Sequence, residues 1–122
     1  MGGSRNGPVA VVDDDLAVLD SLRFLLEIAG HKTTVYDSGP DFLNDLDSRH
    51  CCAILDHHMP NMTGLEVVER LLAQGNDIPV LLITGMPSPA IVARAAALGV
   101  KQVLEKPPLE DDLLEFIARH KC

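Results

Sequence analysis

Polar side chains that could carry out chemistry follow four short apolar runs of the sequence. Asp13 and Asp14 come directly after PVAVV, and Asp56 comes directly after CAIL. Thr84 follows the most apolar run, IPVLLI, and Lys106 follows KQVLE. Functional groups concentrate at such junctions between an apolar strand and a loop. These five residues are therefore the first candidates for a functional site.

If the three carboxylates meet in one crevice, they favour a divalent cation, because close like charges are unfavourable without a counter-charge. Mg²⁺ is typically held by one or two carboxylates while it keeps waters and accepts phosphate oxygens. Lys106 would supply a mobile positive charge, and Thr84 a hydroxyl donor. Phosphoryl transfer requires little beyond positioning and charge neutralisation, and a carboxylate can accept the group as an aspartyl phosphate. The residues fit this reaction better than acid–base hydrolysis.

Short apolar runs alternate with longer amphipathic stretches, and this pattern predicts the elements that position the candidates. Continuous apolar strands separated by helices indicate a parallel sheet covered on both faces. The predicted fold class is α/β, a doubly wound five-stranded parallel sheet of the (βα)5 type. The last helix is expected to turn Leu109, Leu113, Phe116 and Ile117 inward. The predicted strands are 8–12, 31–36, 52–55, 78–83 and 101–105, and the predicted helices are 15–29, 38–46, 64–73, 88–99 and 108–120.

Composition excludes several classes of protein. The chain has 122 residues, 47% of them hydrophobic, which suits one packed domain. The formal charge of −8 opposes nucleic-acid binding, no apolar run approaches a membrane span, and no GxxxxGK run forms a phosphate-binding loop. We expect residues 1–7 to be a flexible leader or a cloning remnant and residues 8–122 to be the domain. The N-terminus lacks the apolar core of a signal peptide, and the three unspaced cysteines are expected to be free thiols, so a cytoplasmic location is expected.

The histidines and cysteines near Asp56 raise an alternative, a transition-metal site. Cys51 lies five residues before Asp56 on a predicted strand, and at about 3.3 Å per residue the two are about 16 Å apart. Zn–S and Zn–N bonds are only about 2 Å long, and Cys51 and Cys52 point to opposite faces of the strand. The cysteines are therefore expected to lie too far away to share a metal with the loop. His57 is expected to be a surface residue that diverges from His58.

Four motifs stand in order at the predicted strand ends: VVDDD, LDHHMPNMTG, LLITG and LEKP. Together they resemble the receiver domains of two-component response regulators, most like the FixJ branch, over nearly the whole chain. The resemblance implies a flavodoxin/CheY-like fold, with self-catalysed phosphotransfer and autodephosphorylation rather than conventional turnover. By position it makes Asp56 the phosphoacceptor, Thr84 a hydrogen-bond partner of the phosphoryl group, and Lys106 a partner of that group or of Asp56. It also implies a cis bond between Lys106 and Pro107.

The resemblance further implies a metal and partners. Mg²⁺, for which Mn²⁺ can substitute, would be bound by Asp14, Asp56 and the backbone carbonyl of His58, with Asp13 acting largely through water. The donor would be the phosphohistidine of a sensor histidine kinase. Phosphorylation would change the face formed by roughly residues 88–121, through which a homodimer can form. A DNA-binding output domain beyond the end of this sequence would suit the FixJ branch.

Three residues are expected to modulate the phosphoryl group or the switch. The His58 side chain, two positions after the acceptor, could overhang the phosphoryl site and affect attack by water. Met86, two positions after Thr84, could cover the site from the other side. Many receivers have an aromatic residue at the position of Val103, and its rotation is coupled to the threonine. Because valine has no ring to bury or expose, that coupling cannot operate here in its usual form.

Simpler explanations and other functions stand beside this prediction. Asp15 is expected simply to cap the first helix. A phosphate-independent interaction module of the same fold is expected to have lost key residues, and none is lost. An aspartyl-phosphate phosphohydrolase of the haloacid-dehalogenase type would need a second aspartate two positions after Asp56, where His58 stands. It would also need a cap domain, for which the chain has no room.

Overall fold

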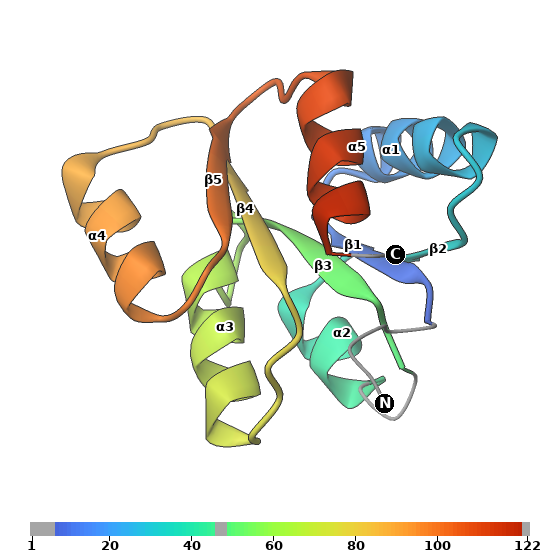
Figure 1. Cartoon of the computed structure of the whole chain (residues 1–122). Coiled ribbons are helices and arrows are strands. Elements are labelled where there is room, and N and C mark those ends of the chain that lie inside the picture. Colours follow the sequence, from blue (N-terminus) through green and yellow to red (C-terminus); the bar gives the residue numbers. More distant parts are fainter. Residues whose placement is uncertain (1–6, 46–48, 121–122) are drawn as a thin grey trace.

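A parallel sheet forms the middle of three layers (Figure 1). The structure is a computed structural model and describes residues 7–45 and 49–120. The strands lie in the order β2-β1-β3-β4-β5, and every neighbouring pair is parallel. This is the five-stranded α/β fold that the sequence predicts. The sheet contains β1 (Val9–Val12), β2 (Thr33–Tyr36), β3 (Cys52–Asp56), β4 (Val80–Thr84) and β5 (Gln102–Glu105).

Helices cover both faces of the sheet, with α1 and α5 on one face and α2, α3 and α4 on the other (Figure 1). Their bounds are α1 (Leu16–Ile28), α2 (Gly39–Asn44), α3 (Gly64–Ala73), α4 (Pro89–Ala97) and α5 (Glu110–Arg119). Successive strand residues point to opposite faces, so the sheet separates two hydrophobic cores. The α3 core includes Ala10, Val12, Phe42, Ala53, Leu55, Leu65, Val67, Leu71, Leu82 and Ala95. The α5 core includes Val9, Val11, Leu19, Leu26, Ile54, Leu81, Ile83, Leu113, Phe116 and Ile117.

Side-chain caps start four of the helices, α1 to α4, and Ser38 caps α2. The Asp15 carboxylate accepts hydrogen bonds from two N–H groups in the first turn of α1, and the Ser88 hydroxyl caps α4 ahead of Pro89. Helix α5 has no side-chain cap, because its N-cap residue is Leu109. Leu109 is 68% exposed, so the expectation that it faces inward is wrong. It fits the apolar spacing in the sequence, but it precedes the first helical residue, so that spacing does not carry it to the buried face.

Strand register brings the candidate residues to one edge of the sheet. The residue before Asp13 pairs with the residue before Asp56, so the two aspartates follow side by side. Asp56 pairs with Ile83, the residue before Thr84. The backbone N–H of Lys106 donates to the Thr84 carbonyl at 2.9 Å, which ties the end of β5 to the end of β4. The carboxyl ends of four strands thus carry the side chains that the sequence singles out.

Some expectations fall partly or wholly outside the described residues. The leader expected over 1–7 lies outside the described residues except for Gly7. Cys122 and the last residue of the helix expected over 38–46 also lie outside them. Helix α2 itself ends at Asn44. Cys51 is disulfide-bonded, so the expectation of a free thiol is wrong there. Cys52 lies in the α5 core, and burial raises the pKa of its thiol to about 12. Within 7–45 and 49–120, no helix combines the length and the apolar character needed to span a membrane.

Candidate functional site

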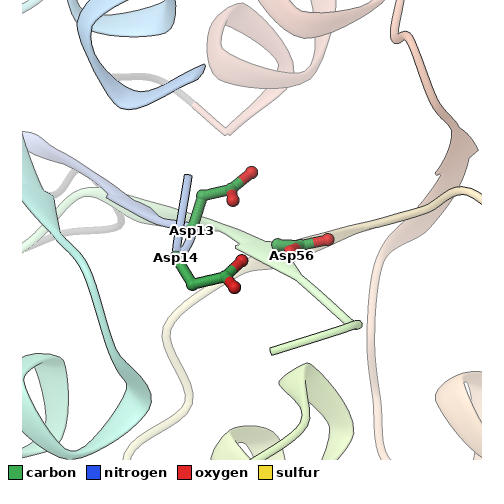
Figure 2. A group of neighbouring side chains, drawn as sticks. All are labelled: Asp13, Asp14 and Asp56. Atoms are coloured by element: carbon green, nitrogen blue, oxygen red, sulfur yellow. The ribbon is translucent and has the colours of Figure 1, made fainter. Parts of the chain in front are cut away.

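Three carboxylates, which we call the acidic cluster, meet at the carboxyl ends of β1 and β3. Figure 2 shows Asp13, Asp14 and Asp56 extending in the same direction from these strand ends. Each offers an oxygen, and these oxygens all lie within 4.8 Å of one another. Asp13 is 4% exposed and Asp56 is 2% exposed, whereas Asp14 is exposed. The cluster therefore concentrates negative charge where two of its members have little water around them.

Lys106 supplies the positive charge opposite the acidic cluster. Its Nζ lies 2.8 Å from Asp56 Oδ1 and 3.8 Å from Asp13 Oδ2. The contact with Asp56 is an ion pair rather than a well-aligned hydrogen bond. Neither carboxylate oxygen of Asp56 has a partner with hydrogen-bond geometry among the described residues. The Lys106–Pro107 peptide bond is cis, as the resemblance to receiver domains implies.

The pKa values of Asp13 and Lys106 are both raised, for different reasons. Burial raises the pKa of Asp13 from 3.8 to about 6. The hydrogen bond from the Asp15 N–H and the charge of Lys106 oppose this rise, and the charges of Asp56 and Asp14 add to it. Burial alone would lower the pKa of Lys106, but its contact with Asp56 and the nearby carboxylates raise it overall. The site thus keeps its lysine charged and makes a charged Asp13 unfavourable unless another cation is near.

The donor set of the acidic cluster suits a hard divalent cation. Three carboxylates supply oxygen only, which favours Mg²⁺, Ca²⁺ or Mn²⁺ over metals that prefer thiolate or imidazole. The buried oxygens of Asp56 have open lone pairs, and a cation would relieve the unfavourable charge of Asp13. In the part of the chain that the structure describes, no other His, Cys, Asp or Glu group forms a metal-sized cluster, so the Cys/His alternative finds no support. The expected ligation by the His58 carbonyl stays a prediction.

Two groups outside the acidic cluster hold the Thr84 hydroxyl. Thr84 is 0% exposed at the end of β4. His58 Nε2 lies 2.7 Å from Thr84 Oγ1, and the backbone N–H of Met86 donates to the same oxygen at 3.1 Å. The Met86 side chain is 74% exposed, so the contact of this residue with Thr84 is through its backbone. The sequence places His58 and Met86 near the site but gives no sign that both bind Thr84.

The loop after Asp56 departs from the expectation in one respect. His57 is only 9% exposed, so its placement on the surface is wrong. Its ring lies edge-on to that of His58, with centroids 5.0 Å apart, rather than diverging from it. The backbone explains this, because His57 continues the sheet: its N–H donates to the Ile83 carbonyl at 2.9 Å. His58 is the exposed member of the pair.

Gly64, the last residue of the motif LDHHMPNMTG, belongs to the site although it has no reactive side chain. A Cβ at this position would lie 2.7 Å from the backbone oxygen of Asp56 and 2.6 Å from Leu82 Cδ1. The Gly64 N–H also donates to the His57 carbonyl at 3.1 Å, which closes the loop onto the start of α3. The absent side chain therefore lets α3 approach the backbone of the candidate acceptor.

Val103 lies on β5, where it is partly buried and packs against the α3 core. It pairs with Leu82 in the sheet, two residues before Thr84. No aromatic ring therefore occupies this position on β5. A link between Thr84 and the neighbouring helices must use other groups.

Sequence comparisons give the family. The family model described as the response regulator receiver domain matches residues 9–118. The transcriptional regulatory protein FixJ of Bradyrhizobium diazoefficiens is 39% identical over 112 residues, which cover 91% of this chain and 54% of the relative. The response regulator protein TmoT of Ectopseudomonas mendocina is 37% identical over 110 residues, covering 89% of this chain and 50% of the relative. The chain spans about half the length of these curated relatives.

Solved structures agree with the sequence match. The crystal structure of FixJ-N has a TM-score of 0.86 and 30% identity, with 95% of this chain and 94% of that chain covered. A CheY-like response regulator receiver domain protein from Methanospirillum hungatei has a TM-score of 0.86 and 26% identity, with 93% and 91% covered. The family match runs from the start of β1 into α5 and includes every residue of the acidic cluster. The chain belongs to the response regulator receiver family and is a receiver domain of a two-component response regulator.

Proposed function

We propose that Asp56 accepts a phosphoryl group from the phosphohistidine of a sensor histidine kinase, with Mg²⁺ held by the acidic cluster. One observation carries the proposal. The Asp56 carboxylate is buried, and the Lys106 ammonium lies 2.8 Å from it. Neither of its oxygens accepts a hydrogen bond from the described residues, so both have lone pairs free for a ligand. A carboxylate in this setting is oriented, shielded from bulk water and supported by a cation.

The proposed transfer forms a bond between an Asp56 oxygen and phosphorus while the bond from phosphorus to the donor imidazole nitrogen breaks. The electron pair of the broken bond stays on that nitrogen. Lys106 balances charge on the phosphoryl oxygens, and the Thr84 hydroxyl donates a hydrogen bond to one of them. Bound Mg²⁺, or Mn²⁺ in its place, supplies charge neutralisation and orientation of those oxygens. Asp14, Asp56 and the His58 carbonyl would hold it, with Asp13 acting largely through water.

We also propose that phosphorylation changes the face formed by α4, β5 and α5 and so controls an output. FixJ is named a transcriptional regulatory protein, and this chain matches only part of it. A DNA-binding output domain or a homodimer formed through this face would receive the signal. Autodephosphorylation by water returns the domain to its resting state.

Incubation with acetyl phosphate and Mg²⁺, followed by intact-mass measurement, tests the phosphoacceptor proposal. The expected result is a base-labile gain of one phosphoryl group, which is absent in EDTA and absent from Asp56→Asn. Asp20→Asn is the matched control, because Asp20 is an exposed aspartate of α1 away from the acidic cluster. An unmodified wild-type protein, or an adduct that persists in Asp56→Asn, would contradict the proposal.

A further inference from the structure

The hydrogen bond between His58 and Thr84 joins the loop after the candidate acceptor to the end of β4. We propose that His58 is a positioning residue that holds the Thr84 hydroxyl away from Asp56 until a phosphoryl group competes for it. This inference rests on the proposed phosphorylation of Asp56. It gives the domain a coupling between the site and the β4–α4 segment that Val103, without a ring, cannot provide.

The contacts of Thr84 Oγ1 assign the direction of this hydrogen bond. The Met86 N–H already donates to the oxygen at 3.1 Å, so one lone pair is in use. The hydroxyl hydrogen of a fully buried threonine needs an acceptor. The oxygens of Asp56 do not fill that role, because neither has a hydrogen-bond partner among the described residues. His58 Nε2, 2.7 Å away, is the acceptor that remains in the described site, so the Thr84 hydroxyl donates to it.

The same hydrogen is what the proposed phosphorylated state requires. A threonine hydroxyl has one hydrogen, which it can donate to the imidazole or to a phosphoryl oxygen but not well to both. Phosphorylation of Asp56 therefore has to break the bond to His58. Breaking that bond costs about the free energy of one net hydrogen bond. This cost reduces the free energy gained when the Thr84 hydroxyl binds the phosphoryl group.

The surroundings of His58 allow it to bind the Thr84 hydroxyl and later to release it. Edge contact with the buried ring of His57 orients the imidazole toward Thr84. His58 is exposed, so its ring can turn into solvent and exchange Thr84 for water. Movement of the Thr84 hydroxyl also removes the acceptor of the Met86 N–H. Met86 lies two residues before Ser88, which caps α4, so release of Thr84 loosens the segment that enters α4.

Beryllofluoride with Mg²⁺, a phosphoryl analogue, is the probe, and ¹⁹F NMR titration gives its affinity. His58→Phe keeps the bulk and the ring but removes the acceptor, and it should bind the probe about fivefold more tightly, as expected for one net hydrogen bond. His58→Gln places an amide oxygen near the position of Nε2. It should return the affinity towards that of the wild type.

A second measurement examines the bond without metal or probe. In the metal-free protein, Thr84→Val removes the hydroxyl with little change of shape and should shift the ¹⁵N resonance of His58 Nε2. An unchanged resonance would overturn the inference. So would equal or weaker probe affinity in His58→Phe, or tighter binding in both His58 variants, since bulk rather than the bond would then explain it. A wild type that binds no probe overturns the phosphoacceptor proposal and the release step with it, even where the ¹⁵N shift shows that the bond exists.

Discussion

Replacement of Asp13 by Asn should make the metal-free domain more stable at pH 7.5. Burial raises the pKa of Asp13 from 3.8 to about 6, so the folded protein binds this proton more tightly than the unfolded chain does. The stability of the wild type therefore falls as pH rises from about 4 through 6. The gap between the two pKa values corresponds to a loss of about 3 kcal/mol in the free energy of unfolding, at a pH where Asp13 is charged in both the folded and the unfolded state. The neutral Asn avoids this cost, and its side-chain oxygen can still accept from the Asp15 N–H.

The charge of Lys106, whose Nζ lies 3.8 Å from Asp13, already opposes the rise of the pKa to about 6, so this figure of about 3 kcal/mol includes its effect. We therefore expect the free energy of unfolding to rise by about 1–3 kcal/mol at pH 7.5 and by about one third of that amount at pH 4.5. Urea unfolding in the presence of EDTA measures this free energy at each pH. Far-UV circular dichroism is the suitable signal, since the chain has one Tyr and no Trp.

Asp14→Asn is the matched control for this prediction. Asp14 belongs to the same cluster and loop but is exposed, so removal of its charge should change stability much less. Saturating Mg²⁺ should reduce the difference in the free energy of unfolding between Asp13→Asn and the wild type, because a bound cation stabilises the wild-type carboxylate. A gain that is absent, or that is as large at pH 4.5 as at pH 7.5, would show that desolvation of Asp13 is not the cause.

Three further predictions follow from the packing and the charges of the site. Gly64→Ala should lower the free energy of unfolding by about 1–3 kcal/mol in urea, because the added methyl meets the Asp56 carbonyl and Leu82; an unchanged midpoint would mean that α3 shifts freely. Lys106→Met should raise the pKa of Asp13 further, since the lysine charge lowers it, and ¹³C NMR titration of the carboxyl carbon would refute this if the pKa stayed or fell. Phe116→Ala should cost about 3–5 kcal/mol, whereas Leu109→Ala, at an exposed position, should change stability by less than about 0.5 kcal/mol; equal losses would contradict the burial described here.

The meeting of Asp13, Asp56, Thr84 and Lys106 could be predicted from the sequence because it depends on strand ends alone. Parallel strands carry their last residues to one edge whatever the details of packing. The apolar runs mark those strands well enough to place each residue at the edge. The fold class could be predicted for the same reason, since continuous apolar strands between helices leave few arrangements.

Other features depend on contacts between distant residues and could not be predicted. The His58–Thr84 bond joins residues 26 positions apart and needs the side-chain rotamers of both. The burial of His57 follows from a backbone bond to β4 that the histidine itself does not signal. Leu109 fits the apolar spacing of α5 but stands just outside the helix, and helix boundaries are poorly marked after two prolines.

The sheet also acts as a partition between two sets of side chains. On β4, Leu82 belongs to the α3 core, whereas its neighbours Leu81 and Ile83 belong to the α5 core. A substitution in one core reaches the other mainly through the backbone of the strands, so their destabilising effects should be nearly additive. The helices on one face can therefore diverge in sequence during evolution, and with them the partners of the domain, while the opposite face keeps its own packing.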